Sequence, residues 1–355
     1  MRHIAISVLL FACTTDSGDL EAPTDKPVEL GGSYQLANRL DLASAGVLPD
    51  VASTTLHALS QLKEDPAGAI LDLLEATHAP IVSNVLSVIP DALEQPLTQW
   101  INDNVFAALY QGVPVTQQIA SIVDDLASLV TRFQVDTSLD LIEPDVTGAS
   151  AATHSLAGVT FTVAEHALVV RAPDLLSDVT HGDLSASALH IVEQSPDVQN
   201  GIIELRDHSI GLPIGAYVIH GIDQLMMAKF GQPNLRAALG VLVNCSSVAH
   251  NVAQKCIGPV CVGHETELRN LCDAGLDAIV TSVEAQLMAL NFKALHFKHG
   301  AAAMWDAAMA GGPRDGVVDR IEDGIWNLGV DVGTGEHAVY ADFTGVRSST
   351  PAASQ

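Results

Sequence analysis

Four cysteines placed symmetrically about a turn constrain the fold of this 355-residue chain more than any other feature. Cys245 and Cys256 are eleven positions apart, as are Cys261 and Cys272, and Gly258-Pro259 between the two pairs is a turn signal. The outer two cysteines also fall on apolar stripes with a helical period. The sequence therefore predicts an antiparallel helical hairpin from about residue 235 to about residue 290, in which the outer cysteines lie level with each other.

The same spacing limits how the cysteines can pair. Eleven helical residues span roughly 16 Å, whereas the two Cα atoms of a disulfide lie within about 7 Å of each other. The spacing therefore disfavours Cys245–Cys256 with Cys261–Cys272, and equally Cys245–Cys261 with Cys256–Cys272. The nested pairing of Cys245–Cys272 with Cys256–Cys261 is the remaining prediction, and a thiolate metal site or free thiols are the alternatives.

Hydrophobic periodicity divides the rest of the chain into blocks. Residues 50–130 repeat with a helical period and are punctuated by prolines, which predicts a series of short amphipathic helices. The last of the apolar stripes in this block consists of Ile119, Ile122, Val123, Leu126, Leu129 and Val130. Alternation with period two then predicts central strands at 33–43, 132–142, 158–163, 167–171, 184–192 and 202–208, and a further helix is expected at 214–230.

The last sixty residues alternate in short runs separated by Gly and Asp. The expected strands of this C-terminal antiparallel β-meander are 292–299, 301–307, 317–321, 325–332 and 338–346. Asp323-Gly324 is taken as a turn between two of them, and Trp305 and Trp326 as core anchors. Because helices and strands come in blocks rather than in alternating βαβ units, the fold class is α+β.

Charge excludes one class of partner. The chain has 42 acidic and 16 basic residues, a formal net charge of −26, so its surface repels nucleic acid and we expect no DNA or RNA partner. Apolar residues make up 48% of the chain, which is enough for a sizeable core, and an aromatic content of 4% argues against a sugar-stacking platform.

The first thirteen residues, MRHIAISVLLFAC, begin with a positive charge, continue with an apolar run and end in Cys13. Leu10-Phe11-Ala12-Cys13 resembles the lipobox of bacterial lipoproteins. The resemblance implies a signal peptide at 1–12, a lipid on Cys13 and, because Thr14 rather than Asp follows, export to the outer membrane on its periplasmic or surface face. A buried N-terminal strand is the alternative.

The composition after Cys13 predicts how the rest is organised. Residues 13–32 would be a flexible acidic tether that follows the lipidated cysteine. The α+β body would occupy 33–348, as one unit or as two subdomains divided near residue 150, and 349–355 would be a disordered tail.

Site motifs are sparse, and no catalytic residue or cofactor is predicted. Asp315, Asp319, Glu322 and Asp323 crowd two adjacent turns where oxygen ligands could hold Ca²⁺. Their spacing does not fit an EF-hand loop, so solvated turn residues are favoured over a metal site.

The function expected from these features is that of a membrane-anchored, non-enzymatic envelope lipoprotein with a binding or structural role, toward an apolar ligand, a lipid or a protein partner. The C-terminal Asp-Gly turn, Gly324-Ile325-Trp326 and the ending Gly345-Val346-Arg347 resemble those of secreted bacterial lipoproteins of unassigned activity. The succession of a strand, helices and a curved sheet also resembles the lipid-carrying tubular proteins of the TULIP type. The alternative is a secreted hydrolase with a dispersed site, such as a Ser–His–Asp triad.

Overall fold

The computed structural model describes the chain in segments. These are residues 29–42, 109–143, 151–163, 166–177, 191–194, 197–199, 202–254, 256–257, 260–261, 264–289, 292–305, 317–331 and 335–348, with isolated positions between 64 and 103. The predicted signal peptide, lipobox and tail lie outside the described residues, as do most of the tether and most of the N-terminal helices.

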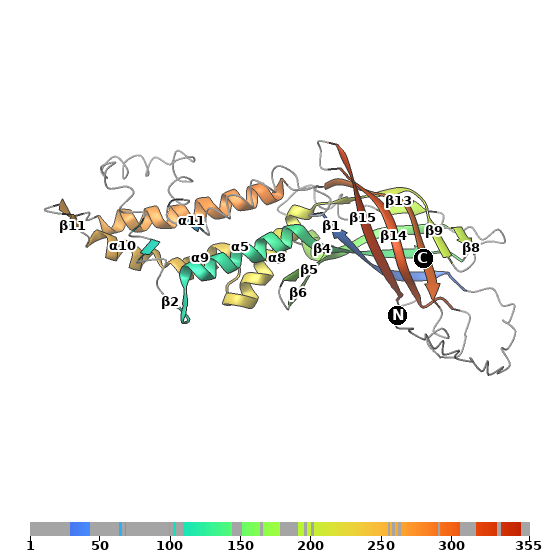
Figure 1. The fold of residues 1–355 in the computed structure, drawn as a ribbon, viewed down its shortest axis with the longest axis horizontal. Helices are drawn as coiled ribbons and strands as arrows, with labels where there is room; N and C mark the ends of the chain where they lie inside the picture. Colours follow the sequence, from blue (N-terminus) through green and yellow to red (C-terminus); the bar gives the residue numbers. More distant parts are fainter. Residues whose placement is uncertain are drawn as a thin grey trace, which may run out of the picture.

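The long strands form one curled antiparallel sheet, shaped like a half-barrel (Figure 1). Its order is β6–β5–β4–β1–β15–β14–β13–β9–β8, with β7 paired to β5 and β10 paired to β13. The strands are β1 (Gly32–Asp41), β4 (Arg132–Leu141), β5 (Ala152–Val163), β6 (His166–Arg171), β7 (Ile191–Gln194), β8 (Asp197–Gln199), β9 (Ile202–Leu205), β10 (His208–Leu212), β13 (Phe292–Trp305), β14 (Arg320–Asp331) and β15 (Glu336–Arg347). Side chains on the concave face alternate with outward polar ones, as period-two patterning requires.

The α+β class, most central strands and the C-terminal antiparallel meander agree with the sequence, but the number of strands in the meander does not. Three long strands, β13, β14 and β15, replace the five short ones that were predicted. The predicted breaks are bulges inside strands: the register shifts between Lys298 and Gly300, and again between Ile321 and Gly324. Asp323-Gly324 is therefore not a turn, and positive φ angles at His299 (43°) and Asp323 (52°) mark the two irregular positions.

The strand predicted at 202–208 is also corrected. The chain breaks at Arg206-Asp207 into β9 and β10, which pair in succession with the same strand, β13. The Asp207 carboxylate accepts a hydrogen bond of 2.9 Å from the backbone N–H of His299, so the break fits the bulge opposite it. Of the strand predicted at 184–192, only Ile191 and Val192 are described, and they begin β7.

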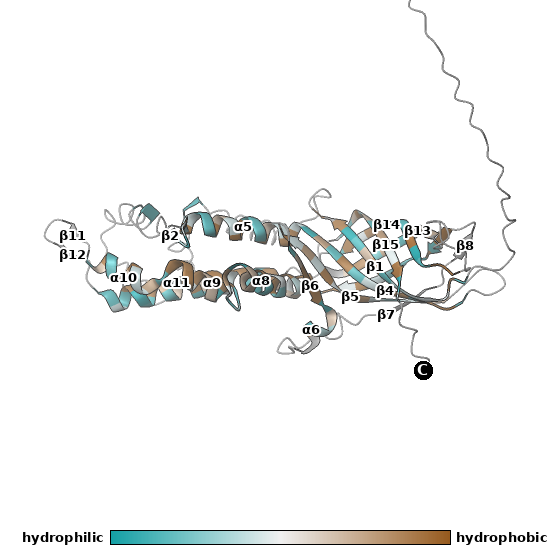
Figure 2. Ribbon diagram, turned by 90° about the horizontal axis from the view of Figure 1, so that it is seen from below, coloured by the Kyte–Doolittle hydropathy of each residue, from teal (hydrophilic) through white to brown (hydrophobic). Residues whose placement is uncertain are grey.

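The longer helices extend from one end of the sheet (Figures 1 and 2), and one six-residue helix lies beside β5 and β6. They are α5 (Val115–Thr131), α6 (Ala172–Ser177), α8 (Ile214–Phe230), α9 (Leu235–Val243), α10 (Cys245–Ala253) and α11 (Glu265–Met288). Helix α5 follows the short hairpin β2 (Leu109–Tyr110)–β3 (Val113–Pro114) and buries the predicted stripe at Ile119, Ile122, Val123, Leu126, Leu129 and Val130. It runs directly into β4, while α8 follows β10 and α11 precedes β13.

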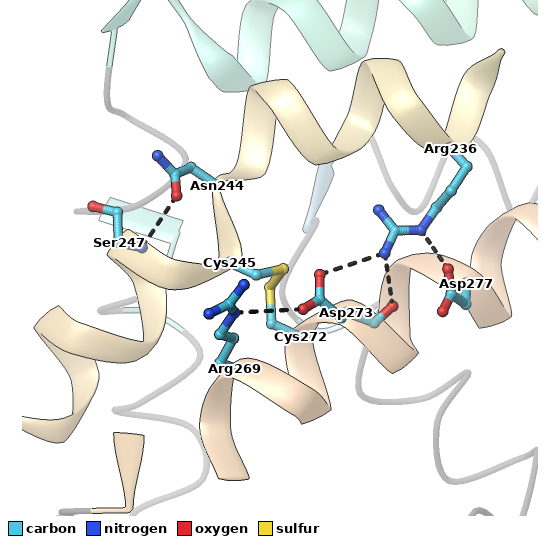
Figure 3. Close-up of a disulfide and its surroundings, with 8 residues drawn as sticks. All are labelled: Arg236, Asn244, Cys245, Ser247, Arg269, Cys272, Asp273 and Asp277. Carbon is cyan, nitrogen blue, oxygen red and sulfur yellow. Dashed lines mark hydrogen bonds and ion pairs between the residues drawn. A yellow bond between two sulfur atoms is a disulfide. The ribbon is translucent and has the colours of Figure 1, made fainter. Parts of the chain in front are cut away.

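The predicted helical hairpin is present, with a break in its first arm. Asn244 adopts a left-handed conformation (φ 43°) that separates α9 from α10, and its side chain accepts a hydrogen bond from the Ser247 N–H (3.2 Å). Cys245 begins α10 and forms a disulfide with Cys272 of α11, with Cα atoms 5.6 Å apart (Figure 3). The outer bridge of the nested pairing is therefore confirmed.

Ion pairs beside the disulfide hold α9 against α11 (Figure 3). The Arg236 guanidinium pairs with Asp277 and reaches Asp273 at 3.4 Å. These side chains are partly exposed, so each pair contributes on the order of 0.5 kcal/mol. The covalent disulfide between α10 and α11 is thus the stronger link, and the ion pairs add weak contacts between α9 and α11.

The inner cysteines lie at the tip of the hairpin, where the backbone favours a second bridge. Strands β11 (Cys256–Ile257) and β12 (Val260–Cys261) pair antiparallel, with Cys256 directly opposite Cys261. Directly opposed residues have Cα atoms about 4.5–5.5 Å apart, which is within disulfide range. The cysteine side chains lie outside the described residues, so this bridge stays a prediction.

We expect non-reducing peptide mapping to recover Cys256 linked to Cys261 as well as Cys245 linked to Cys272. The reason is that direct opposition in a two-residue hairpin leaves no other cysteine within reach. Alkylation of the unreduced, unfolded chain gives the control count of free thiols. Modification of both Cys256 and Cys261 in that control would contradict the inner bridge.

Two glycines make room for the aromatic side chains that fill the concave face. A Cβ atom at Gly300 would overlap the Trp326 ring, and one at Gly324 would overlap the Phe343 ring. Trp326 and Phe343 are 0% and 1% exposed and stack with ring centroids 4.8 Å apart. The prediction of Trp326 as a core anchor is confirmed, while the side chain of Trp305 lies outside the described residues.

Gly300→Ala should therefore lower the free energy of unfolding by about 2 kcal/mol, because the added methyl group displaces a fully buried indole. Urea unfolding measures this loss. Gly240→Ala is the matched control: only the flexible end of Arg236 lies near it, in the middle of α9. That change should stabilise the chain by up to about 1 kcal/mol. Equal effects at the two positions would contradict the close packing at Gly300.

Candidate functional site

Four polar side chains lie buried inside the curled sheet. Asn38, Thr137, His154 and His208 are 0%, 1%, 0% and 8% exposed. Each occupies a position of its strand that points to the apolar interior: Asn38 on β1, Thr137 on β4, His154 on β5 and His208 on β10. Burial of an unpaired polar group costs on the order of 1–3 kcal/mol. These four side chains therefore need hydrogen-bond partners inside the sheet.

These four residues, with Trp326, form a continuous hydrogen-bonded series that we call the polar chain. Trp326 Nε1 donates to Asn38 Oδ1 (3.0 Å), and Asn38 Nδ2 bonds Thr137 Oγ1 (3.0 Å) and the Val135 carbonyl (2.9 Å). The Thr137 hydroxyl lies 2.7 Å from His154 Nε2. The other nitrogen of His154, Nδ1, lies 2.6 Å from His208 Nε2, and His208 Nδ1 lies 2.9 Å from the carbonyl oxygen of Arg206.

Chemistry fixes the direction of every bond in the polar chain. The indole N–H can only donate, and the Val135 and Arg206 carbonyls can only accept. His208 must therefore donate from Nδ1, so its neutral Nε2 accepts from His154 Nδ1–H. In turn His154 Nε2 accepts from Thr137, whose oxygen accepts from Asn38. All donors thus point from Trp326 toward Arg206, with both imidazoles neutral.

Burial keeps both histidines uncharged. Desolvation, and then the neighbouring His208, hold the pKa of His154 well below its usual value. Desolvation also lowers the pKa of His208 to about 4, although the Arg206 carbonyl and the nearby Asp207 carboxylate act in the opposite direction. At neutral pH the polar chain therefore carries no charge.

Aromatic rings enclose the two imidazoles. His208 stacks on Phe297 with centroids 4.8 Å apart and an interplanar angle of 8°, and His154 lies parallel to Trp326 at 6.1 Å. Phe297 meets Trp326 edge to face at 5.0 Å. Such packing strengthens the hydrogen bonds by excluding water, and it increases the cost of placing a charge there.

The His154–His208 bond also connects strands that are far apart in the sheet. The path from β10 to β5 runs through β13, β14, β15, β1 and β4, so the two strands belong to opposite sides of the curl. Yet β10 approaches both β5 and β7 in space. Among the described strands no backbone pairing joins β10 to β5 or β7. We call this junction the seam, and the two histidines bridge it.

The residues singled out from the sequence lie elsewhere. Cys13 is outside the described residues, and so is Asp315 of the calcium hypothesis. Glu322 pairs with Arg320 (3.3 Å), and Asp323 occupies the β14 bulge. Within the described segments no three His, Cys, Asp or Glu side chains gather as a metal-binding group.

The polar chain bears on the hydrolase alternative. The structure brings a hydroxyl, Thr137, to an imidazole, His154, as in a nucleophile–base pair. Both are buried, however, and the third member is His208 rather than a carboxylate. A substrate would have to enter a lumen already filled by Trp326 and Phe297, so this geometry favours a structural role.

Sequence reasoning missed the polar chain, although a signal exists. The inward phase of β1 reads Tyr34, Leu36, Asn38, Leu40, and Asn38 is its only polar member apart from the Tyr34 hydroxyl. In the same way Thr137 falls between Val135 and Leu139 on β4. Polar residues in the apolar phase of a predicted strand are the pattern that would have found the site.

Comparison with known proteins gives no relative. The chain matches no protein-family model, no curated protein and no solved structure. None of the described helices has both the length and the hydrophobicity needed to cross a membrane. The class that the fold itself defines is an α+β protein with a curled antiparallel sheet and a disulfide-linked helical arm.

Proposed function

We propose that the protein is an exported lipoprotein, anchored through Cys13 in the outer membrane, whose non-enzymatic body holds a helical arm away from the membrane toward an envelope partner. The observation that carries the proposal is the position of the chain ends relative to the helices. The lipobox resemblance at Leu10–Cys13 supplies the anchor.

The registers place both ends of the described body at the same end of the sheet. Gly32 at the start of β1 pairs with Leu141, the end of β4, whereas the start of β4 follows α5. Arg347 at the end of β15 lies beside the start of β1. Both ends of the described body therefore lie at the end of the sheet that is away from the helices.

Side chains secure the point at which the body begins. The Tyr34 hydroxyl lies 2.8 Å from the Leu30 carbonyl and 3.1 Å from that of Val318. The Arg347 guanidinium pairs with Glu29 (3.1 Å) and donates to the Gly31 carbonyl. A force applied to the chain before Glu29 would thus be transmitted to the central strands β1 and β15.

The opposite end is built as a stiff projection. Helix α11 has 24 residues, which corresponds to about 36 Å at the usual helical rise, and Cys245–Cys272 links it to α10 near the tip. The sixteen residues from Cys13 to Val28 would extend roughly 20 Å on average as a flexible chain. An anchored molecule would then keep its sheet end closer to the membrane than its helical tip.

Replacing the anchoring residue tests the first half of the proposal. Cys13→Ser should abolish the lipid mass increment on the protein and move it from the membrane fraction to the soluble fraction, because a single side chain carries the acyl groups. Cys245→Ser is the matched control, since it removes another cysteine and should leave fractionation unchanged. Wild-type protein that lacks a lipid mass increment would refute the anchor.

Fluorescence energy transfer tests whether the helical arm points away from the membrane. Energy transfer to a headgroup dye, in vesicles that carry the lipidated protein, should be stronger from a label at Thr344 near the sheet end than from one at Ser246 on α10. Equal transfer would mean that the arm lies along the membrane. That result would overturn the projection while leaving the anchor intact.

A further inference from the structure

The seam of the curled sheet depends on the two histidines for its polar connection. On one side β10 pairs with β13, and on the other β5 pairs with β4 and β7. Within the described segments the hydrogen bond from His154 Nδ1 to His208 Nε2, 2.6 Å long, is the link between the polar chain on β14, β1, β4 and β5 and strand β10. Loss of this bond would remove that polar link between the described side chains on the two sides of the seam.

The His154–His208 hydrogen bond survives the addition of one proton to the two imidazoles but not of two. In the neutral state the four ring nitrogens share two protons. A third can be placed on His154 Nε2, facing Thr137 Oγ1, but the Thr137 hydroxyl then loses its acceptor. A fourth proton puts N–H groups on both nitrogens of the 2.6 Å contact and turns the hydrogen bond into repulsion between two cations. Two added protons therefore break the link.

The surroundings give these cations little compensation. The groups described in contact with the rings are Thr137, the Arg206 carbonyl, Phe297 and Trp326, none of which carries a charge at that contact. The other charged or titratable side chains described on β4, β5, β9, β10, β13 and β14 and in the Arg206-Asp207 loop are Arg132, Asp136, Asp140, Glu204, Arg206, Asp207, His296, Lys298, His299, Arg320, Glu322, Asp323 and Asp331. Of these, Asp207 acts on His208 by its charge, but its carboxylate accepts from the His299 N–H. Lys298 pairs with Glu336, and His296 bonds Ser209 at 2.7 Å.

We propose that His154 and His208 form an acid-labile latch, and that two protons open the seam between β10 and the β5–β7 side and expose the aromatic interior. The rest of the sheet stays paired, because its other strands are joined by backbone ladders. The open form presents Phe297, Trp326 and Phe343, which the closed form buries, to solvent. This inference does not depend on the lipid anchor.

Trp326 is a built-in reporter of the latch, since it is fully buried and stacks beside His154. Trp100→Phe and Trp305→Phe leave it as the only tryptophan of the chain. Acrylamide quenching of this variant, followed from pH 7 to pH 4, measures access to the interior. Far-UV circular dichroism of the same samples reports whether the sheet stays folded. Collisional quenching is preferred to intensity because a protonated imidazole can itself quench the indole.

The open fraction should rise by up to about 100-fold per pH unit below pH 6.5, since opening binds two protons. The open fraction should rise at a higher pH than the one at which the far-UV circular dichroism begins to change. The rise should reverse on return to pH 7. His208→Gln keeps an acceptor for His154 but cannot be protonated. The open fraction of this variant should therefore rise by only about 10-fold per pH unit. His337→Gln, on the exposed side of β15, is the matched control and should keep the steeper dependence.

Three outcomes would overturn the latch. One is quenching of Trp326 that rises only together with the loss of circular dichroism, because the sheet would then unfold as a whole. Another is a shielded Trp326 throughout the range in which the histidines titrate. The third is a His208→Gln variant with an unchanged dependence. If that variant does not fold, the comparison of quenching with circular dichroism in the parent chain still decides.

Discussion

Asn38→Leu should lower the free energy of unfolding by about 3–5 kcal/mol, more than any other single substitution considered in this protein. Leucine has the same branching and the same number of side-chain heavy atoms as asparagine, so the shape of the side chain is largely preserved. What is lost is the acceptor for the Trp326 indole N–H and a donor to both Val135 and Thr137. Each buried polar group left without its partner costs roughly 1–3 kcal/mol.

Urea unfolding with the disulfides intact measures this effect. Asn327→Leu is the matched control, because Asn327 lies on the exposed face of β14 next to Trp326. An exposed change of this kind should stay within about 0.5 kcal/mol of the wild type. A loss below about 1 kcal/mol for Asn38→Leu would indicate that the polar chain contributes little to stability.

The stability of the wild-type chain should decrease as the pH falls from 6.5 toward 4. Burial lowers the pKa of His208 from 6.5 to about 4 in the folded state, and that of His154 is lowered as well. In this range the unfolded chain binds more protons than the folded chain, so acid favours unfolding. The stabilisation that comes from burying the two neutral histidines is fully present above pH 6.5. His208 alone accounts for a loss of about 3 kcal/mol by pH 4, since one pKa unit corresponds to about 1.4 kcal/mol.

Unfolding free energies measured at several pH values separate this contribution from that of the carboxylates. His208→Gln removes one titrating group, so the slope between pH 6.5 and pH 5 should fall by about 1.4 kcal/mol per pH unit. His337→Gln replaces an exposed histidine and should keep the wild-type slope. The assignment of the pH dependence to His208 fails if the two variants show the same slope.

Local sequence patterns were enough to predict the elements with uninterrupted periodicity. Helix α8 and strands β1 and β4 lie within one or two residues of their predicted bounds, because each has one clear hydrophobic period. The Cys245–Cys272 disulfide was also predictable, since the symmetric spacing about a turn disfavours the competing pairings. The inner bridge and the anchor at Cys13 remain predictions.

Local patterns could not separate a turn from a bulge. Gly and Asp favour positive φ angles in both, so Asp323-Gly324 read as the end of one strand and the start of another. Whether such a residue reverses the chain or only bends it depends on the neighbouring strand. Strand β15 continues past Asp323 and pairs with β14 on both sides of the bulge, which makes β14 one strand.

The sequence by itself determined the fold class, the helical arm with its outer disulfide, and the strongly acidic charge. These follow from periodicity, spacing and composition, which are properties of neighbouring residues. Only the tertiary structure decided that Asn38, Thr137, His154 and His208 form one polar chain. His154 and His208 are 54 positions apart, on strands at opposite sides of the sheet, and they meet because the sheet curls. Curvature is a collective property of many paired strands, and no local pattern encodes which side chains it brings together.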